Sequence, residues 1–290
     1  MANTIAVTKE YIANLDEVYR RGSLTQDLNA NPLKIRKGAI AGEYLVNKYK
    51  MDGLGDYDRN TGYVQGEITT EWETIKANYD RGRKFVVDVL DNEESAEVAF
   101  GELASQFVKH KVVPEGDAFT FATIASTNNI TKLTPKSFTK GKDLRDEVIT
   151  AMTKMDEDEV YPEGRILYVT PTNYNLLFGE ENTFNKDIFD LFSKVVKVPQ
   201  TRFYTEIELK DGKGAKKEGG YAKKATTGKD INFMIVQKDA VIKTDIHIAS
   251  DIIPPALNAD SDGYIQKYRK HGLVYVYENM TAGIAMSTKA

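Results

Sequence analysis

The sequence predicts an α+β protein in which an extended β-ribbon leads into one long helix and an α/β unit follows. Residues 33–80 alternate between apolar and polar side chains, as half-covered strands do. Residues 92–126 repeat apolar side chains at helical spacing. Residues 141–250 alternate between helical and strand-like patterns. These three observations together indicate the fold class.

The composition narrows the class of protein. The chain has 290 residues, a net charge of −4 and 41% hydrophobic residues, which is ordinary for a globular protein. Such a charge does not attract nucleic acid by itself. The absence of cysteine excludes disulfides, thiolate metal sites and a cysteine nucleophile. No apolar run approaches the roughly 18 residues of a membrane span, and the N-terminus lacks a signal-peptide pattern, so we expect no membrane association.

The first elements are an arm and a ribbon. Residues 1–32 form an arm with a short amphipathic pattern, ending in a loop-like QDLNANP. Residues 33–51 and 62–80 are expected to form two long strands, because they are rich in β-branched and aromatic side chains. Turn-forming Gly, Asp and Asn lie between them. A two-stranded ribbon is marginally stable in water, so this one should lie on a neighbouring molecule.

The long helix comes next. Asp91 and Glu94 have the spacing of a capping box, and further glutamates suit the positive end of the helix dipole. Pro114 should kink or interrupt the helix, although apolar spacing resumes after it. A continuous helix from Asn92 to Ser126 would be roughly 50 Å long at 1.5 Å per residue.

The remaining elements belong to the α/β unit and the C-terminal strands. We expect a helix over 142–160, a buried strand over 165–170, a helix from Pro171 capped by Thr170, and a short helix over 184–196. Residues 211–230 read as a polar loop rich in Gly and Lys. Strands are expected over 231–237 and 240–250, with Pro254 and Pro255 as a break, and a pair of strands over 262–287.

Residues 56–67 partly match a calcium-binding loop. Asp56, Asp58, Asn60 and Glu67 occupy ligand positions, but Thr61 stands where the loop requires glycine. The flanks also read as strands rather than helices. A plain Asp/Asn/Gly turn is therefore favoured over a metal site.

The other candidate sites give no catalytic set. The carboxylates in 155–160 end a helix and are expected to be solvated, and the 211–230 loop lacks a phosphate-binding motif. His110, His247 and His271 are far apart in sequence, and no Ser/His/Asp arrangement can be assembled. We therefore predict no catalytic residue, no metal site and no cofactor.

Charged side chains gather where the ribbon meets the helix. Arg81, Arg83 and Lys84 could bind phosphate, but pairing with Asp80, Asp88 and Asp91, or with glutamates of a neighbour, is favoured. Tyrosine is abundant, which is weakly typical of protein interfaces. We predict that the subunit contacts include these residues: Trp72, Asp80, Arg81, Arg83, Asp88 and Asp91.

With these residues in view, the chain resembles the major capsid proteins of tailed bacteriophages, which have the HK-ninety-seven-like fold. Residues 55–94 resemble the extended loop that runs into that family's spine helix. The helix with its internal VVPEGDAFTFA resembles the spine itself. Residues 159–177 resemble a strand–helix core of the axial domain, and 262–284 resemble returning peripheral strands.

The resemblance implies a domain organisation. The N-terminal arm is 1–32, the extended β-hairpin loop 33–90 and the peripheral domain with its spine helix 91–140. The axial domain is 141–252, and 253–290 returns to the strands of the peripheral domain.

The resemblance also implies a function. The chain is expected to be a structural protein of the virion that self-assembles as hexamers and pentamers into an icosahedral shell around double-stranded DNA. The DNA would be contacted non-specifically, and a portal would be a further partner. The arm is only about thirty residues and lacks a long helical extension, so a separate scaffolding protein is expected. Two alternatives remain open: an encapsulin-like bacterial compartment that encloses enzymes, and a metal- or nucleotide-dependent enzyme.

Overall fold

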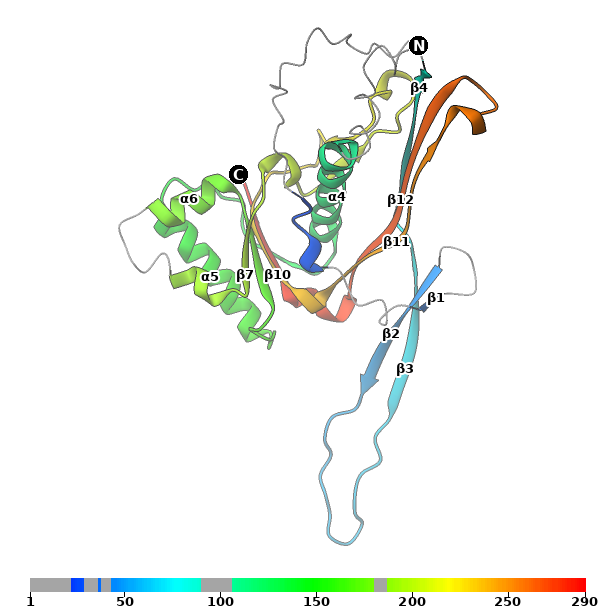
Figure 1. The fold of residues 1–290 in the computed structure, drawn as a ribbon. Helices are drawn as coiled ribbons and strands as arrows, with labels where there is room; N and C mark the ends of the chain where they lie inside the picture. Colours follow the sequence, from blue (N-terminus) through cyan, green and yellow to red (C-terminus); the bar gives the residue numbers. More distant parts are fainter. Residues whose placement is uncertain (1–21, 29–35, 38–42, 90–105, 180–186) are drawn as a thin grey trace.

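A computed structural model describes residues 22–28, 36–37, 43–89, 106–179 and 187–290. Two sheets form the body, and a β-ribbon extends far from it (Figure 1). No helix in these ranges is both long enough and apolar enough to cross a membrane.

The five-stranded sheet is the centre of the body. Its strand order is β5-β13-β10-β6-β7, comprising β5 (Thr131–Lys132), β13 (Ile284–Thr288), β10 (Ile231–Gln237), β6 (Arg165–Val169) and β7 (Lys194–Lys197). Every residue of β6 and β10 is buried, because both faces of the sheet are covered.

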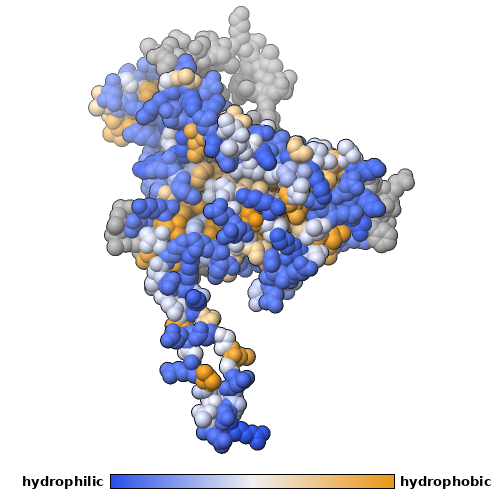
Figure 2. Space-filling view, turned by 180° about the vertical axis from the view of Figure 1, so that it is seen from behind, coloured by the Kyte–Doolittle hydropathy of each residue, from blue (hydrophilic) through white to orange (hydrophobic). Residues whose placement is uncertain are grey.

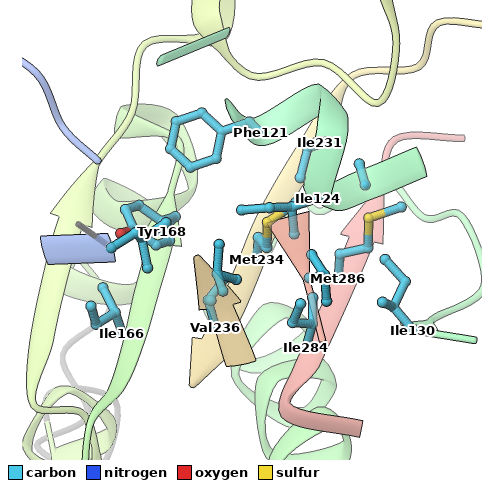
Figure 3. Close-up of a cluster of buried hydrophobic side chains, with 14 of the residues drawn as sticks. Phe121, Ile124, Ile130, Ile166, Tyr168, Ile231, Met234, Val236, Ile284 and Met286 are labelled. Atoms are coloured by element: carbon cyan, nitrogen blue, oxygen red, sulfur yellow. The ribbon is translucent and has the colours of Figure 1, made fainter. Parts of the chain in front are cut away.

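Alternate residues of these strands enter two different cores. Ile166 and Tyr168 face α4 (Val113–Ser126), where Phe121 and Ile124 pack against them (Figure 3). Leu167 and its neighbours face α5 (Gly141–Glu157) and α6 (Pro171–Gly179). The expected helix over 142–160, the buried strand over 165–170 and the helix from Pro171 are thus confirmed.

The second sheet of the body, which we call the three-stranded sheet, has the order β11-β12-β4 and is antiparallel throughout. It consists of β11 (Val241–Ile253), β12 (Gly263–Val276) and β4 (Tyr79–Asp88). β11 ends at the predicted break, since a 3-10 helix, η8 (Pro255–Leu257), follows. The predicted polar loop 211–230 is not free of strands: β9 (Tyr221–Lys223) lies within it and pairs with β8 (Ile207–Leu209), which precedes it, and η6 (Gly214–Lys216) lies between the two strands.

The ribbon consists of β2 (Glu43–Met51) and β3 (Ile68–Lys76), with β1 (Arg36–Lys37) paired to the base of β2. The predicted strand pair is therefore confirmed, but the strands are shorter and the connecting loop spans 52–67. The sequence 77–78 also interrupts the second predicted strand, and β4 begins at Tyr79 as part of another sheet.

The long predicted helix departs from regular α-helical hydrogen bonding just before Pro114, where an interruption was expected. Residues 108–112 form a π-helical turn, η3 (Val108–Val112), and the Val113 N–H bonds to the Val108 carbonyl. Pro114 follows in the first turn of α4. Because proline has no N–H to donate, the wider turn adjusts the hydrogen-bond pattern just before it. The predicted part of the helix over 92–105 lies outside the described residues, as does its capping box.

The helix expected over 184–196 was wrong. Residues 188–197 do not continue a helix: they form a 3-10 turn, η4 (Ile188–Leu191), and then β7, because the β-branched Val195 and Val196 pair with β6. The predicted domain boundaries stay a prediction. In the observed pairing, β12 lies between β11 and β4, whereas β13 pairs with β10 and β5 in the other sheet.

Candidate assembly surface

The two faces of the ribbon differ in charge. Opposite residues of an antiparallel pair place their side chains on the same face, and the register sets Tyr49 opposite Thr70 and Met51 opposite Ile68. Between Leu45 and Met51, the β2 and β3 side chains on this face include no Asp, Glu, Lys, Arg or His, and we call it the uncharged face. It consists of these residues: Leu45, Asn47, Tyr49, Met51, Ile68, Thr70, Trp72 and Thr74.

The uncharged face leaves large apolar side chains in solvent. The exposed fractions are 63% for Tyr49, 67% for Met51, 72% for Ile68 and 45% for Trp72. Figure 2 shows hydrophobic residues along the ribbon, outside the body of the molecule. Contiguous exposed apolar surface of this kind marks an interaction site.

The opposite face anchors the ribbon to the body at its base. Tyr44, Val46 and Ile75 are buried against Ile242 and Leu273 of the three-stranded sheet. Further out, this face is charged, and Lys48 bonds to Glu73 at 2.6 Å and to Glu278 at 2.7 Å. Both bonds raise the pKa of Lys48, and the bond to Glu278 has the larger effect. The ribbon is thus fixed at one end, on one face.

The tip of the ribbon is a compact turn rather than a calcium loop. The Asp58 carboxylate accepts hydrogen bonds from the N–H groups of Asn60 (2.6 Å) and Thr61 (3.1 Å). These bonds lower the pKa of Asp58. Gly62 has φ +82°, which suits a glycine. Within the described residues, no group of three His, Asp or Glu side chains could hold a metal ion.

Arg81 and Arg83, two of the predicted contact residues, are engaged inside the chain. Arg81 Nε donates to Glu115 Oε1 at 2.8 Å, and Tyr79 donates to the same oxygen at 3.2 Å. Arg83 Nη2 donates to the Lys217 carbonyl at 2.8 Å. Pairing within the chain is therefore observed, but the partners are Glu115 and backbone carbonyls rather than the nearby aspartates.

Asp80 pairs on the opposite face of β4. Arg269 holds its carboxylate through two hydrogen bonds of 2.9 and 2.6 Å, which lower the pKa of Asp80. His271 Nδ1 lies 3.6 Å from Asp80, and His247 is opposite His271 in the ladder. Two histidines that are distant in sequence thus meet beside Asp80.

The other predicted contacts have different surroundings. Trp72 lies on the uncharged face, with the Arg36 guanidinium 5.1 Å from its ring centre. Asp88 is exposed at the end of β4, and Asp91 lies outside the described residues. A role of all six residues in subunit contacts stays a prediction.

Sequence reasoning missed a buried cluster of charged side chains. Asp117 of α4 is fully buried and accepts hydrogen bonds from Ser23 Oγ (2.7 Å), the Leu24 N–H (3.0 Å) and Thr25 Oγ1 (2.8 Å). Arg202 Nη1 donates to it at 3.1 Å. Lys243 Nζ donates to Thr25 Oγ1 at 2.6 Å, and burial lowers the pKa of Lys243. We call these six residues the Asp117 cluster.

The Asp117 cluster joins four parts of the chain. Ser23, Leu24 and Thr25 belong to the arm, Asp117 to α4, Arg202 to η5 (Gln200–Arg202) and Lys243 to β11. The described part of the arm is therefore built into the core, where Leu28 is also buried. No local sequence signal links these residues, because their contacts span between 85 and 220 positions.

No family model matches the sequence, and no curated protein sequence matches it. Solved structures do match its fold. A chain of the cyanophage P-SCSP1u capsid is 14% identical, with a TM-score of 0.60 over 98% of this chain and 93% of that one. A chain of Mycobacterium phage Bobi is 10% identical, with a TM-score of 0.61 over 98% and 96%.

A virus-like particle from Pyrococcus furiosus is similar over a smaller part. Its TM-score is 0.51 at 10% identity, over 84% of this chain and 86% of that one. The phage chains match more of the molecule and match it better. The chain therefore has the HK-ninety-seven-like capsid fold, which confirms the predicted fold class.

Proposed function

We propose that this chain is the major capsid protein of a tailed bacteriophage, assembling as hexamers and pentamers into an icosahedral shell around double-stranded DNA. The observation that carries the proposal is the uncharged face of the ribbon. Tyr49, Met51, Ile68 and Trp72 expose their side chains there, and the described part of the same chain does not bury them. A second copy that covers this face would remove that apolar surface from water.

The form of the contact follows from the shape of the molecule. The ribbon leaves the body (Figure 1). In this proposal, its uncharged face meets a different surface on the neighbouring copy. Such head-to-tail contacts close into rings when the rotation between copies allows it. Rings of this kind are the capsomers that the proposal requires. The role is structural rather than catalytic, and the proposed location is the virion.

The direct experiment is electron microscopy of the purified full chain, alone and with a co-expressed scaffolding protein. The proposal expects rings or closed shells, and a chain that stays monomeric under every assembly condition contradicts it. Particles isolated from a phage lysate should protect double-stranded DNA from nuclease and contain a portal. Shells that hold cargo enzymes and no DNA would instead support a bacterial compartment.

A further inference from the structure

Two segments of the chain carry strong and opposite charge. The ribbon tip, residues 52–67, has four carboxylates against Arg59, a net charge of −3. Residues 210–229, which we call the basic loop, have seven lysines against Asp211 and Glu218, a net charge of +5. The positive charge of the basic loop is thus opposite in sign to the net charge of the whole chain, which is −4.

Part of the positive charge has no partner in the described structure. Lys216 pairs with Glu208, Lys224 with Glu206 and Lys223 with Asp230. In contrast, the described residues place no carboxylate within ion-pair distance of Lys210, Lys213 or Lys217. Lys213 and Lys217 are also exposed. The basic loop therefore presents free ammonium groups to solvent.

The basic loop is held in place by β4. Arg81 Nη2 donates to the carbonyls of Lys210 (2.8 Å) and Gly220 (3.3 Å), and Arg83 Nη2 to that of Lys217. Gly212 has φ +76°, and a Cβ there would lie 2.8 Å from Arg83 Nη1. The loop thus wraps closely around the Arg83 guanidinium, which fixes the positions from which its lysines project.

A cleft of about 470 Å³ lies beside the basic loop. It opens between β4, the helical residues 106–115 and residues 210–220. Its lining combines the aromatic rings of Phe85, Phe107 and Tyr268 with five Lys and Arg side chains, which outnumber the three carboxylates of Glu115, Asp211 and Glu218. An acidic group with aromatic side chains is chemically complementary to such a lining.

The ribbon tip has that chemistry. Tyr57 and Tyr63 pack together with ring centres 4.8 Å apart, and they remain 60% and 90% exposed. Asp56 and Glu67 have exposed side chains beside them. The ribbon tip thus carries exposed acidic and aromatic side chains at the end of a long ribbon.

The two segments do not meet within one chain. The ribbon points away from the body, whereas the basic loop lies beside the far end of β4 (Figure 1). We propose that the ribbon tip of one copy docks on the basic loop and cleft of the next copy. This rests on the proposed function and names the receiving surface for the ribbon. Opposite charges also steer the encounter and set the register of the two copies.

Charge reversal tests the pairing. The tip variant carries Asp56→Lys and Glu67→Lys, and the loop variant carries Lys213→Glu and Lys217→Glu. Each should lower the yield of assembled particles by about tenfold at low salt, because like charges then face each other. The chain that carries all four substitutions should recover to within about threefold of the native yield, since opposite charges face again. Sedimentation and electron microscopy give the yields.

A matched control reverses two exposed lysines elsewhere. Lys142→Glu with Lys154→Glu on α5 changes the net charge by the same amount as the loop variant and should leave the yield within about twofold of native. Thermal unfolding of the unassembled subunit should be the same in all variants. A general effect of net charge would lower the yield of this control as much as that of the loop variant, and that result would contradict the pairing.

The outcomes are distinct. A native chain that assembles, with no rescue in the fourfold variant, overturns this inference and leaves the proposed function standing. A loop variant that assembles normally but no longer retains DNA places the basic loop against nucleic acid and also overturns it. A native chain that forms no particles overturns the proposed function and this inference together.

Discussion

The Asp117 cluster and the ribbon reverse the usual distribution of side chains in opposite ways. The cluster places charged groups in the core, and the ribbon places large apolar groups in solvent. Within the cluster, each charge finds its partner in the same chain. On the uncharged face of the ribbon, the described chain offers Trp72 only the Arg36 guanidinium.

The difference separates folding from assembly. Removing a charge from the cluster leaves buried partners without compensation, so it should act on the stability of one subunit. Removing an apolar group from the ribbon costs the isolated subunit little, because the group is already in water. The effect of a substitution on subunit stability should therefore decrease from the Asp117 cluster to the ribbon.

Asp117→Asn should have the largest effect. The substitution keeps the shape of the side chain but leaves Arg202 buried without its anion and removes the buried negative charge closest to Lys243's partner Thr25. We expect a loss of about 3–5 kcal/mol in the free energy of unfolding, measured by urea denaturation of the unassembled subunit. Asp211→Asn, at an exposed position, is the control and should change stability by less than about 0.5 kcal/mol. A similarly small change for Asp117→Asn would contradict the structural role of the cluster.

Arg81→Ala should have an intermediate effect. It removes the bond to Glu115 and two bonds to backbone carbonyls of the basic loop. Because Arg81 is partly exposed, we expect a loss of about 1–2 kcal/mol, again in the unassembled subunit. An unchanged subunit that no longer assembles would instead support Arg81 as a direct subunit contact.

The pair of Asp80 and Arg269 should make a small contribution that depends on pH. Bonding to Arg269 lowers the pKa of Asp80 below the ordinary range of an aspartate. A lowered carboxyl pKa stabilises the folded state above the unfolded pKa, and that contribution disappears as the pH falls through the folded pKa. Native protein should thus be more stable than Asp80→Asn at pH 7, and the difference should vanish toward pH 2. A difference that grows on acidification would contradict this sign.

Much of the body was predictable because its signals are local. The buried run of β6 and the Thr170–Pro171 start of α6 can be read from neighbouring residues. A helix was wrongly predicted over 184–196 because the apolar spacing there suits a helix as well as a strand. The end of this segment forms a strand because it pairs with β6. The pairing of β13 with β10 could not be read from alternation, which gives a strand but not its partner.

The sites were predictable to different degrees. Alternation showed the ribbon, but the register of β2 and β3 was needed to see that Tyr49, Met51 and Ile68 share one face. Pairing of Arg81 with a carboxylate was expected, but nearby aspartates were the expected partners within the chain, and its actual partner Glu115 belongs to α4. The Asp117 cluster left no local signal, since its partners come from four distant segments.

The uncharged face of the ribbon gives the smallest expected change in subunit stability and the most direct test of assembly. The test variant carries Tyr49→Ser and Ile68→Ser, and the control carries Lys50→Ser and Glu71→Ser on the charged face of the same strands. Both should unfold within about 0.5 kcal/mol of native protein, because all four side chains are exposed. Particles counted by electron microscopy at matched concentration are the readout. We predict that the control forms rings or shells and the test variant does not, whereas normal particles from the test variant would contradict assembly through this face.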